Sequence, residues 1–170
     1  MTLPQIAVFV VFPAAMAYAA ASDLVSMTIS NRLCLLLAAG FAVCAASVGL
    51  GWPQLALHLA AGSLVLVLCF GLFAAGWMGG GDAKLAAGTA LWFGFEPLPA
   101  YLLATAIAGG ILTLVLTQLR TAPLPVKAES WRWAKRLHGV QEGVPYGVAL
   151  AFGALAVLPH APIWRLAILG

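Results

Sequence analysis

Residues 54–95 read QLALHLAAGSLVLVLCFGLFAAGWMGGGDAKLAAGTALWFGF, which is an apolar run, a glycine-rich turn and a second apolar run. A helix that crosses a bilayer needs about 20 mostly apolar residues. The turn carries Asp82, and a carboxylate at the edge of a bilayer costs a few kcal/mol, so such residues usually have a function. We therefore predict two neighbouring membrane helices with a functional acidic turn between them.

The composition extends this prediction to the whole chain. Of the 170 residues, 64% are apolar and 8% are charged, whereas a soluble domain carries about 25% charged residues. We predict an all-α, polytopic membrane protein that forms a single membrane domain over residues 1–170. The first apolar run has no basic segment before it and no obvious cleavage site, so we expect it to be retained as a span.

The apolar runs predict about six transmembrane helices in one bundle. They cover residues 4–21, 32–50, 54–76, 83–95, 100–119 and 144–158. Residues 120–143 are the one long polar loop, and residues 159–170 suit a short interfacial helix.

The basic residues orient this bundle. With six spans, one side holds Arg32, Lys84, Arg120, Lys127, Arg132, Lys135 and Arg136, and the other holds only Arg165. By the positive-inside rule the first side is cytoplasmic and both termini lie outside. The net charge of +3 is thus a topology signal and implies no nucleic-acid partner. The basic loop favours a short amphipathic helix on an anionic leaflet over a site for an acidic substrate region.

Asp23 and Asp82 are the two aspartates of the chain, and this topology places both on the cytoplasmic face. Two carboxylates about 3 Å apart share one proton and can act as an acid–base pair. The alternative is that each aspartate only caps the end of a span. The charge count does not separate these two interpretations.

The other polar residues have simpler explanations. Ser30 and Asn31 stand where a helix cap is expected, and Lys84 and Arg32 suit interfacial anchors. Gly79–Gly81 allow either an ordinary turn or the close approach of another backbone. His58, His138 and His160 have no partners at metal-ligand spacing, and Cys34, Cys44 and Cys69 suit apolar filler, so we expect no metal site.

Three blocks of the chain resemble one enzyme family. Gly79-x-Gly81-Asp82 is similar to the GxGD signature of intramembrane aspartyl proteases, and Leu85–Gly94 resembles the segment that follows it in type IV prepilin peptidases. Asp23–Asn31 resembles the first-aspartate motif of that family, with Ser30 in place of a proline. Residues 144–149 (VPYGVA) resemble the opening of the family's last span. The presenilin-type Tyr-Asp motif is missing.

The resemblance implies a catalytic pair, Asp23 and Asp82, with Gly79, Gly81, Lys84 and Asn31 as loop or substrate-binding residues and no cofactor. It implies an endopeptidase in the bacterial inner membrane that cleaves prepilin leaders at the cytoplasmic face. The partners it implies are the prepilin, the lipid bilayer and the pilus assembly machinery. The chain looks most like the small Flp/Tad pilus type, and without a CxxC-bearing region we expect cleavage without N-methylation.

Two other functions remain open at this stage. The chain could be a non-enzymatic membrane subunit of a pilus assembly or secretion system. It could also be a small proton-coupled transporter that uses the two aspartates as a relay, although polar residues within the spans are sparse.

Overall fold

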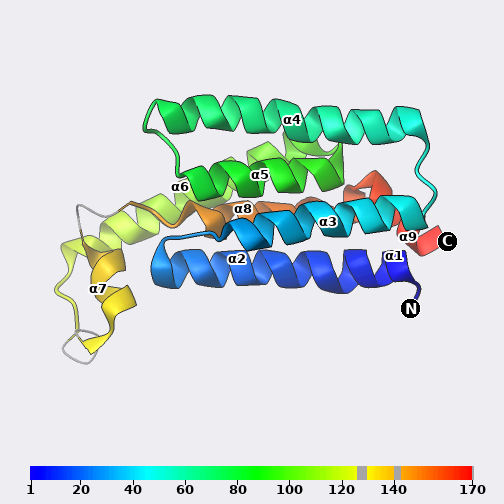
Figure 1. Cartoon of the computed structure of the whole chain (residues 1–170). Helices are drawn as coiled ribbons and strands as arrows, with labels where there is room; N and C mark the ends of the chain where they lie inside the picture. The colour runs from blue at the N-terminus through cyan, green and yellow to red at the C-terminus, as the bar shows by residue number, and fades with distance from the viewer. Residues whose placement is uncertain (126–129, 140–142, 170) are drawn as a thin grey trace.

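Helices make up the regular structure of the described chain, which comprises residues 1–125, 130–139 and 143–169 of this computed structural model (Figure 1). In chain order they are α1 (Leu3–Ile6), the π-helical turn η1 (Ala7–Val11), α2 (Phe12–Ser26), α3 (Asn31–Ser47), α4 (Trp52–Ala74), α5 (Gly80–Phe93), α6 (Leu98–Thr121), α7 (Arg132–His138), α8 (Tyr146–Val157), the 3₁₀ turn η3 (Leu158–His160) and α9 (Pro162–Leu169). The predicted all-α class is confirmed.

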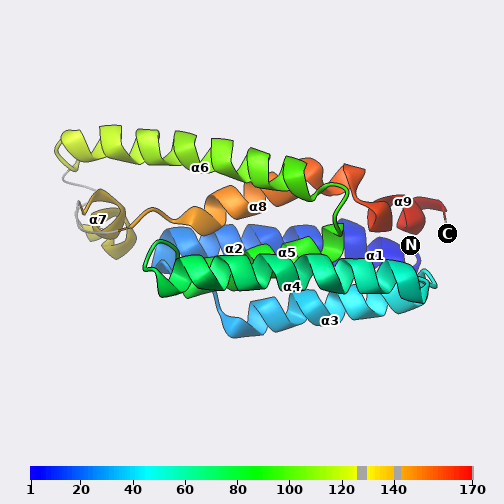
Figure 2. The ribbon, with the colours of Figure 1, turned by 90° about the horizontal axis from the view of Figure 1, so that it is seen from above.

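The longer helices form one bundle. α1, η1 and α2 join into a single rod, and this rod, α3, α4, α5, α6 and α8 lie along a common axis in alternating directions (Figures 1 and 2). Short connections favour such antiparallel neighbours. All the predicted apolar runs therefore correspond to helices of the bundle.

The number of membrane crossings is a separate question. Three helical segments are long and apolar enough to span a bilayer: Leu3–Ser26, Trp52–Ala74 and Leu98–Thr121. A fourth is present if α8 with η3 and α9 count as one span bent by 53°. α3 has 17 residues and α5 has 14, which is short for a straight crossing, so six spans remain a prediction.

Two predicted boundaries near the aspartates are wrong. The first helix continues past Ala21 to Ser26 and ends where Met27 adopts a left-handed conformation with φ of 52°, so Asp23 lies inside it. The helix expected from residue 83 begins at Gly80. The chain reverses earlier, around Gly76 with φ of 76°, a conformation that glycine adopts without a Cβ clash.

α5 lies at the centre of the bundle and packs against α3, α4 and α8. Trp92 is fully buried near its end. The indole N–H of Trp92 donates to the carbonyl of Leu37 at 2.9 Å, and its ring centroid lies 5.0 Å from that of Phe12. Since lipid tails are as apolar as these side chains, close packing rather than water exclusion holds such helices together.

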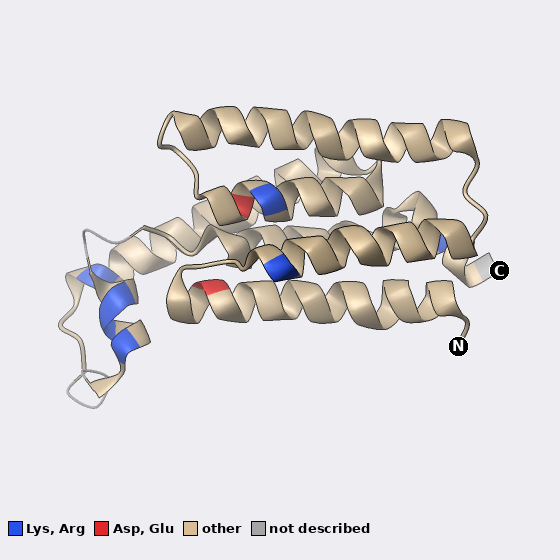
Figure 3. Cartoon of the chain, viewed as in Figure 1, with Lys and Arg blue, Asp and Glu red and all other residues tan. Residues whose placement is uncertain are grey.

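The charged residues are distributed unevenly along the axis. The basic helix α7 lies crosswise at one end, and the acidic positions of α2 and α5 are at that same end (Figure 3). α7 is attached by Arg120, whose Nε donates to the Leu137 carbonyl at 2.8 Å, and by Arg136, whose Nη1 donates to the Val25 carbonyl at 3.3 Å. Lys127 lies outside the described residues.

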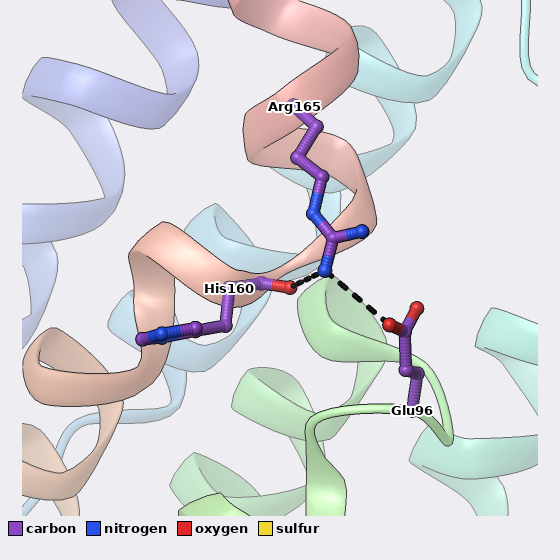
Figure 4. A network of polar contacts seen from close by, with 3 residues as sticks. All are labelled: Glu96, His160 and Arg165. Atoms are coloured by element: carbon purple, nitrogen blue, oxygen red, sulfur yellow. Dashed lines mark hydrogen bonds and ion pairs between the residues drawn. The ribbon is translucent and has the colours of Figure 1, made fainter.

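The opposite end carries one surface ion pair. Arg165 of α9 lies 3.3 Å from Glu96 and also donates to the His160 carbonyl at 3.0 Å (Figure 4). Both side chains of the pair are exposed, and exposed pairs contribute little stability. This end of the bundle contains neither aspartate.

The central position of Trp92 gives a stability prediction. We expect Trp92→Ala to lower the thermal unfolding temperature of the purified protein in detergent, with a loss of about 3 kcal/mol or more from the cavity it leaves. Trp77→Ala is the matched control because Trp77 is 81% exposed. Equal effects of the two substitutions would contradict the central role of α5 packing.

Candidate functional site

Asp23 is a buried carboxylate on the last turns of α2, with 5% of its surface exposed. Its backbone carbonyl accepts the Met27 amide at 2.8 Å and so closes its own helix. Its side chain points elsewhere, because Oδ2 accepts the backbone N–H of Gly147 at 2.7 Å. The side chain of Asp23 therefore accepts a hydrogen bond from the first turn of α8 and does not cap the end of α2.

The backbone N–H of Gly147 has no hydrogen-bond partner within its own helix. α8 begins at Tyr146 after the N-cap residue Pro145, and the first N–H groups of a helix have no partner within it. The positive end of the helix dipole also favours a negative group there. A carboxylate from another helix thus fills the N-terminus of α8.

Asp82 is the third residue of α5 and is partly exposed. The N-cap position is Gly79, and no side-chain hydrogen bond caps this helix. The carboxylate of Asp82 folds back over Gly79, since a Cβ at residue 79 would stand 2.9 Å from Oδ2. Asp82 is therefore not the N-cap residue of α5, and its carboxylate interacts electrostatically with that of Asp23.

Ile29 joins the two helix N-termini around these aspartates. It lies in the link between α2 and α3 and is buried. A Cβ at Gly81 would stand 3.0 Å from Cβ of Ile29, and a Cβ at Gly147 would stand 2.9 Å from its Cδ1. Both first turns therefore need glycine to reach this side chain, which brings α5 and α8 together beside Asp23.

Asn31 and Lys84 form a second link between the two motifs. The ammonium group of Lys84 donates to Oδ1 of Asn31 at 2.8 Å. The cap itself is Ser30, whose hydroxyl accepts the Leu33 amide at 3.3 Å. Lys84 follows Asp82 by two residues and so lies on the opposite side of α5. In the described part of the chain, neither aspartate forms an ion pair.

A lateral groove opens on the Lys84 side of α5. It has a volume of about 510 Å³ and lies between α3, α4 and α5, with Asn31 and Lys84 at one end and Leu91 at the other. Its lining includes the small residues Gly62, Ser63 and Gly88. Neither aspartate lines this groove.

The histidines and cysteines have structural surroundings. Within residues 1–125, 130–139 and 143–169, no group of three or more His, Cys, Asp or Glu side chains could hold a metal ion. His58 is buried, and its Nδ1 lies 2.8 Å from the Leu91 carbonyl. Cys44 and Cys69 are buried as free thiols, and Cys34 is partly buried.

The structure brings together most of the residues singled out from the sequence. Asp23 and Asp82 lie at one end, Gly79 and Gly81 shape the turn beside Asp82, and Asn31 contacts Lys84. Two further residues at this site, Ile29 and Gly147, had no role predicted from the sequence. The signal for Gly147 was the VPYGVA block, and the signal for Ile29 was its place in the Asp23–Asn31 block, but neither pattern indicated what these residues contact.

Comparison with known proteins gives one match. A model of the type IV leader peptidase family matches residues 10–114, a range that includes both aspartates and the glycine turn. Searches of curated proteins and of solved structures found no significant match. The match covers more than half of the chain, and the chain belongs to the type IV leader peptidase family, whose members are prepilin-processing proteases.

Proposed function

We propose that this protein is a membrane aspartyl endopeptidase that removes prepilin leaders, with Asp23 and Asp82 as its catalytic pair. The observation that carries the proposal is the environment of Asp23. It is a buried carboxylate, held by the Gly147 amide of α8 at 2.7 Å, at the end of the bundle that also carries the acidic position of α5. Carboxylates inside an apolar membrane bundle are costly, and those that occur usually have a function.

The pair supplies acid and base for peptide hydrolysis. One carboxylate takes a proton from a water molecule, whose oxygen attacks the carbonyl carbon of the scissile bond, while the protonated partner donates to the carbonyl oxygen. The tetrahedral intermediate then breaks its C–N bond, and a proton passes to the leaving amine. No covalent enzyme intermediate and no cofactor take part.

The neighbouring residues hold the geometry of this pair. Gly81 allows α5 to press against Ile29, and the Lys84–Asn31 hydrogen bond ties α5 to the start of α3. Gly79 leaves room for the carboxylate of Asp82. In this proposal Asn31 and Lys84 position the site rather than react, and Gly79 keeps the backbone open to an extended substrate.

The charge distribution supports an orientation with the aspartates at the cytoplasmic face of a bacterial inner membrane and both termini outside. We propose that residues 1–170 act as one membrane domain with residues 120–143 as its cytoplasmic loop. The substrate would be a Flp-type prepilin, delivered by the pilus assembly machinery. A basic leader would be repelled by the cations of α7, so α7 suits anionic lipid headgroups better.

We expect Asp23→Asn and Asp82→Asn each to abolish prepilin processing in membranes, with at least a hundredfold lower rate, because each removes one member of the acid–base pair. Glu96→Gln is the matched control, since Glu96 is an exposed acid at the opposite end. The measurement is the size shift of a co-expressed prepilin, with the amount of inserted enzyme determined by immunoblot. Full processing by either aspartate variant would contradict the proposed pair.

The same assay with purified protein separates an enzyme from a scaffold. We expect the wild-type protein alone in detergent to cut a purified prepilin. If the protein is a non-enzymatic assembly subunit, cutting will need another component of the machinery.

We also expect cleavage without methylation. The 170 residues contain three cysteines and no CxxC pair. In the larger members of the family that the chain resembles, paired CxxC motifs bind zinc in a region associated with N-methylation. Mass spectrometry of the mature pilin N-terminus, made by this protein with S-adenosylmethionine present, should show a free amine. A methylated N-terminus would contradict this part of the proposal.

A further inference from the structure

Tyr146 is wedged against the middle of α6. A methyl group at Gly109 would stand 2.6 Å from the hydroxyl oxygen of Tyr146 and closer still to its ring. Any residue larger than glycine at 109 therefore requires the Tyr146 ring to move. The neighbouring Gly110 has no such contact, since nothing lies within 4 Å of a Cβ placed there.

A second close contact joins the same two helices, and here the glycine belongs to α8 and the larger residue to α6. Thr105 of α6 packs directly on Gly153 of α8, and a Cβ at residue 153 would stand 2.9 Å from the Thr105 backbone nitrogen. Small residues at such interfaces let helix backbones approach closely. α8 is therefore held against α6 by two contacts, one at its first residue and one two turns later.

The first of these contacts is next to the group that holds Asp23. Tyr146 precedes Gly147, whose N–H donates to Oδ2 of Asp23 at 2.7 Å. A Cβ placed at Gly147 would stand 2.8 Å from Oδ2 of Asp23 and 2.9 Å from Cδ1 of Ile29, so both side chains pack directly on this glycine. A shift of the first turn of α8 would therefore change the distance between this amide and the carboxylate.

We propose that Tyr146, seated on Gly109, is a positioning residue that sets the Gly147 amide and through it the carboxylate of Asp23. The inference rests on the proposed function for its effect on catalysis. In this proposal Tyr146 acts through the Gly147 amide and not on the reacting atoms. Its phenol ring acts as a spacer between α6 and the first turn of α8, so the ring matters and the hydroxyl does not.

The kinetic test compares four variants of the full-length protein in detergent with a purified prepilin. Gly109→Ala and Tyr146→Ala should each lower kcat by about tenfold or more, because small displacements of catalytic groups are costly, and should leave KM within about twofold. Gly110→Ala and Tyr146→Phe should keep wild-type kcat. In the Tyr146→Ala background, Gly109→Ala should have no further effect.

Hydrogen exchange at the Gly147 amide gives a readout that does not depend on activity. The peptide covering residues 144–150 should exchange faster in Tyr146→Ala and Gly109→Ala, as in Asp23→Ala, and at the wild-type rate in Gly110→Ala and Tyr146→Phe. If Gly109→Ala does not accumulate in membranes, the comparison of Tyr146→Phe with Tyr146→Ala decides the question.

Several results would overturn the inference. They are unchanged exchange and kcat in Tyr146→Ala, a loss in Tyr146→Phe equal to that in Tyr146→Ala, or a rise in KM alone. If the wild-type protein cuts no prepilin while Tyr146→Ala still exchanges faster than wild type at residues 144–150, the positioning contact stands and the proposed function is contradicted.

Discussion

The hydrogen bond from the Gly147 amide to the carboxylate of Asp23 is the contact around which this site is organised. It joins residues 124 positions apart, at the two ends of the chain. A helix N-terminus buried in an apolar bundle needs an acceptor, and a buried carboxylate needs a donor. The Gly147 amide and the Asp23 carboxylate satisfy each other, and their hydrogen bond fixes the position of α2 relative to α8.

Close approaches at glycine build the rest of the site around this bond. Gly81 and Gly147 both reach Ile29, and Gly109 receives Tyr146. In a bilayer such contacts contribute more than apolar area does, because lipid competes equally well for exposed leucine. The result is a closely packed end of the bundle that carries the acidic positions of both α2 and α5, next to the basic helix α7 (Figure 3).

Much of this arrangement could be predicted from the sequence. The apolar runs indicated each bundle helix, and the basic residues placed Asp23 and Asp82 together before any motif was considered. The helix ends near the aspartates could not be predicted, because Gly80 and Gly81 look like a turn in the sequence and yet begin α5, where they pack closely on Phe73 and Ile29. The Asp23–Gly147 bond was equally hidden, since no local pattern records which distant amide a carboxylate will accept.

The proposed hydrolysis requires above all that Asp23 and Asp82 belong to one site. The direct measurement is chemical cross-linking of cysteines at these two positions in a protein whose native cysteines are replaced by alanine, using a short bifunctional thiol reagent. We expect rapid intramolecular cross-linking of Asp23→Cys/Asp82→Cys and none of Asp23→Cys/Glu96→Cys, whose two positions lie at opposite ends of the bundle. Absence of the first cross-link in a folded protein whose single cysteines both react would contradict it.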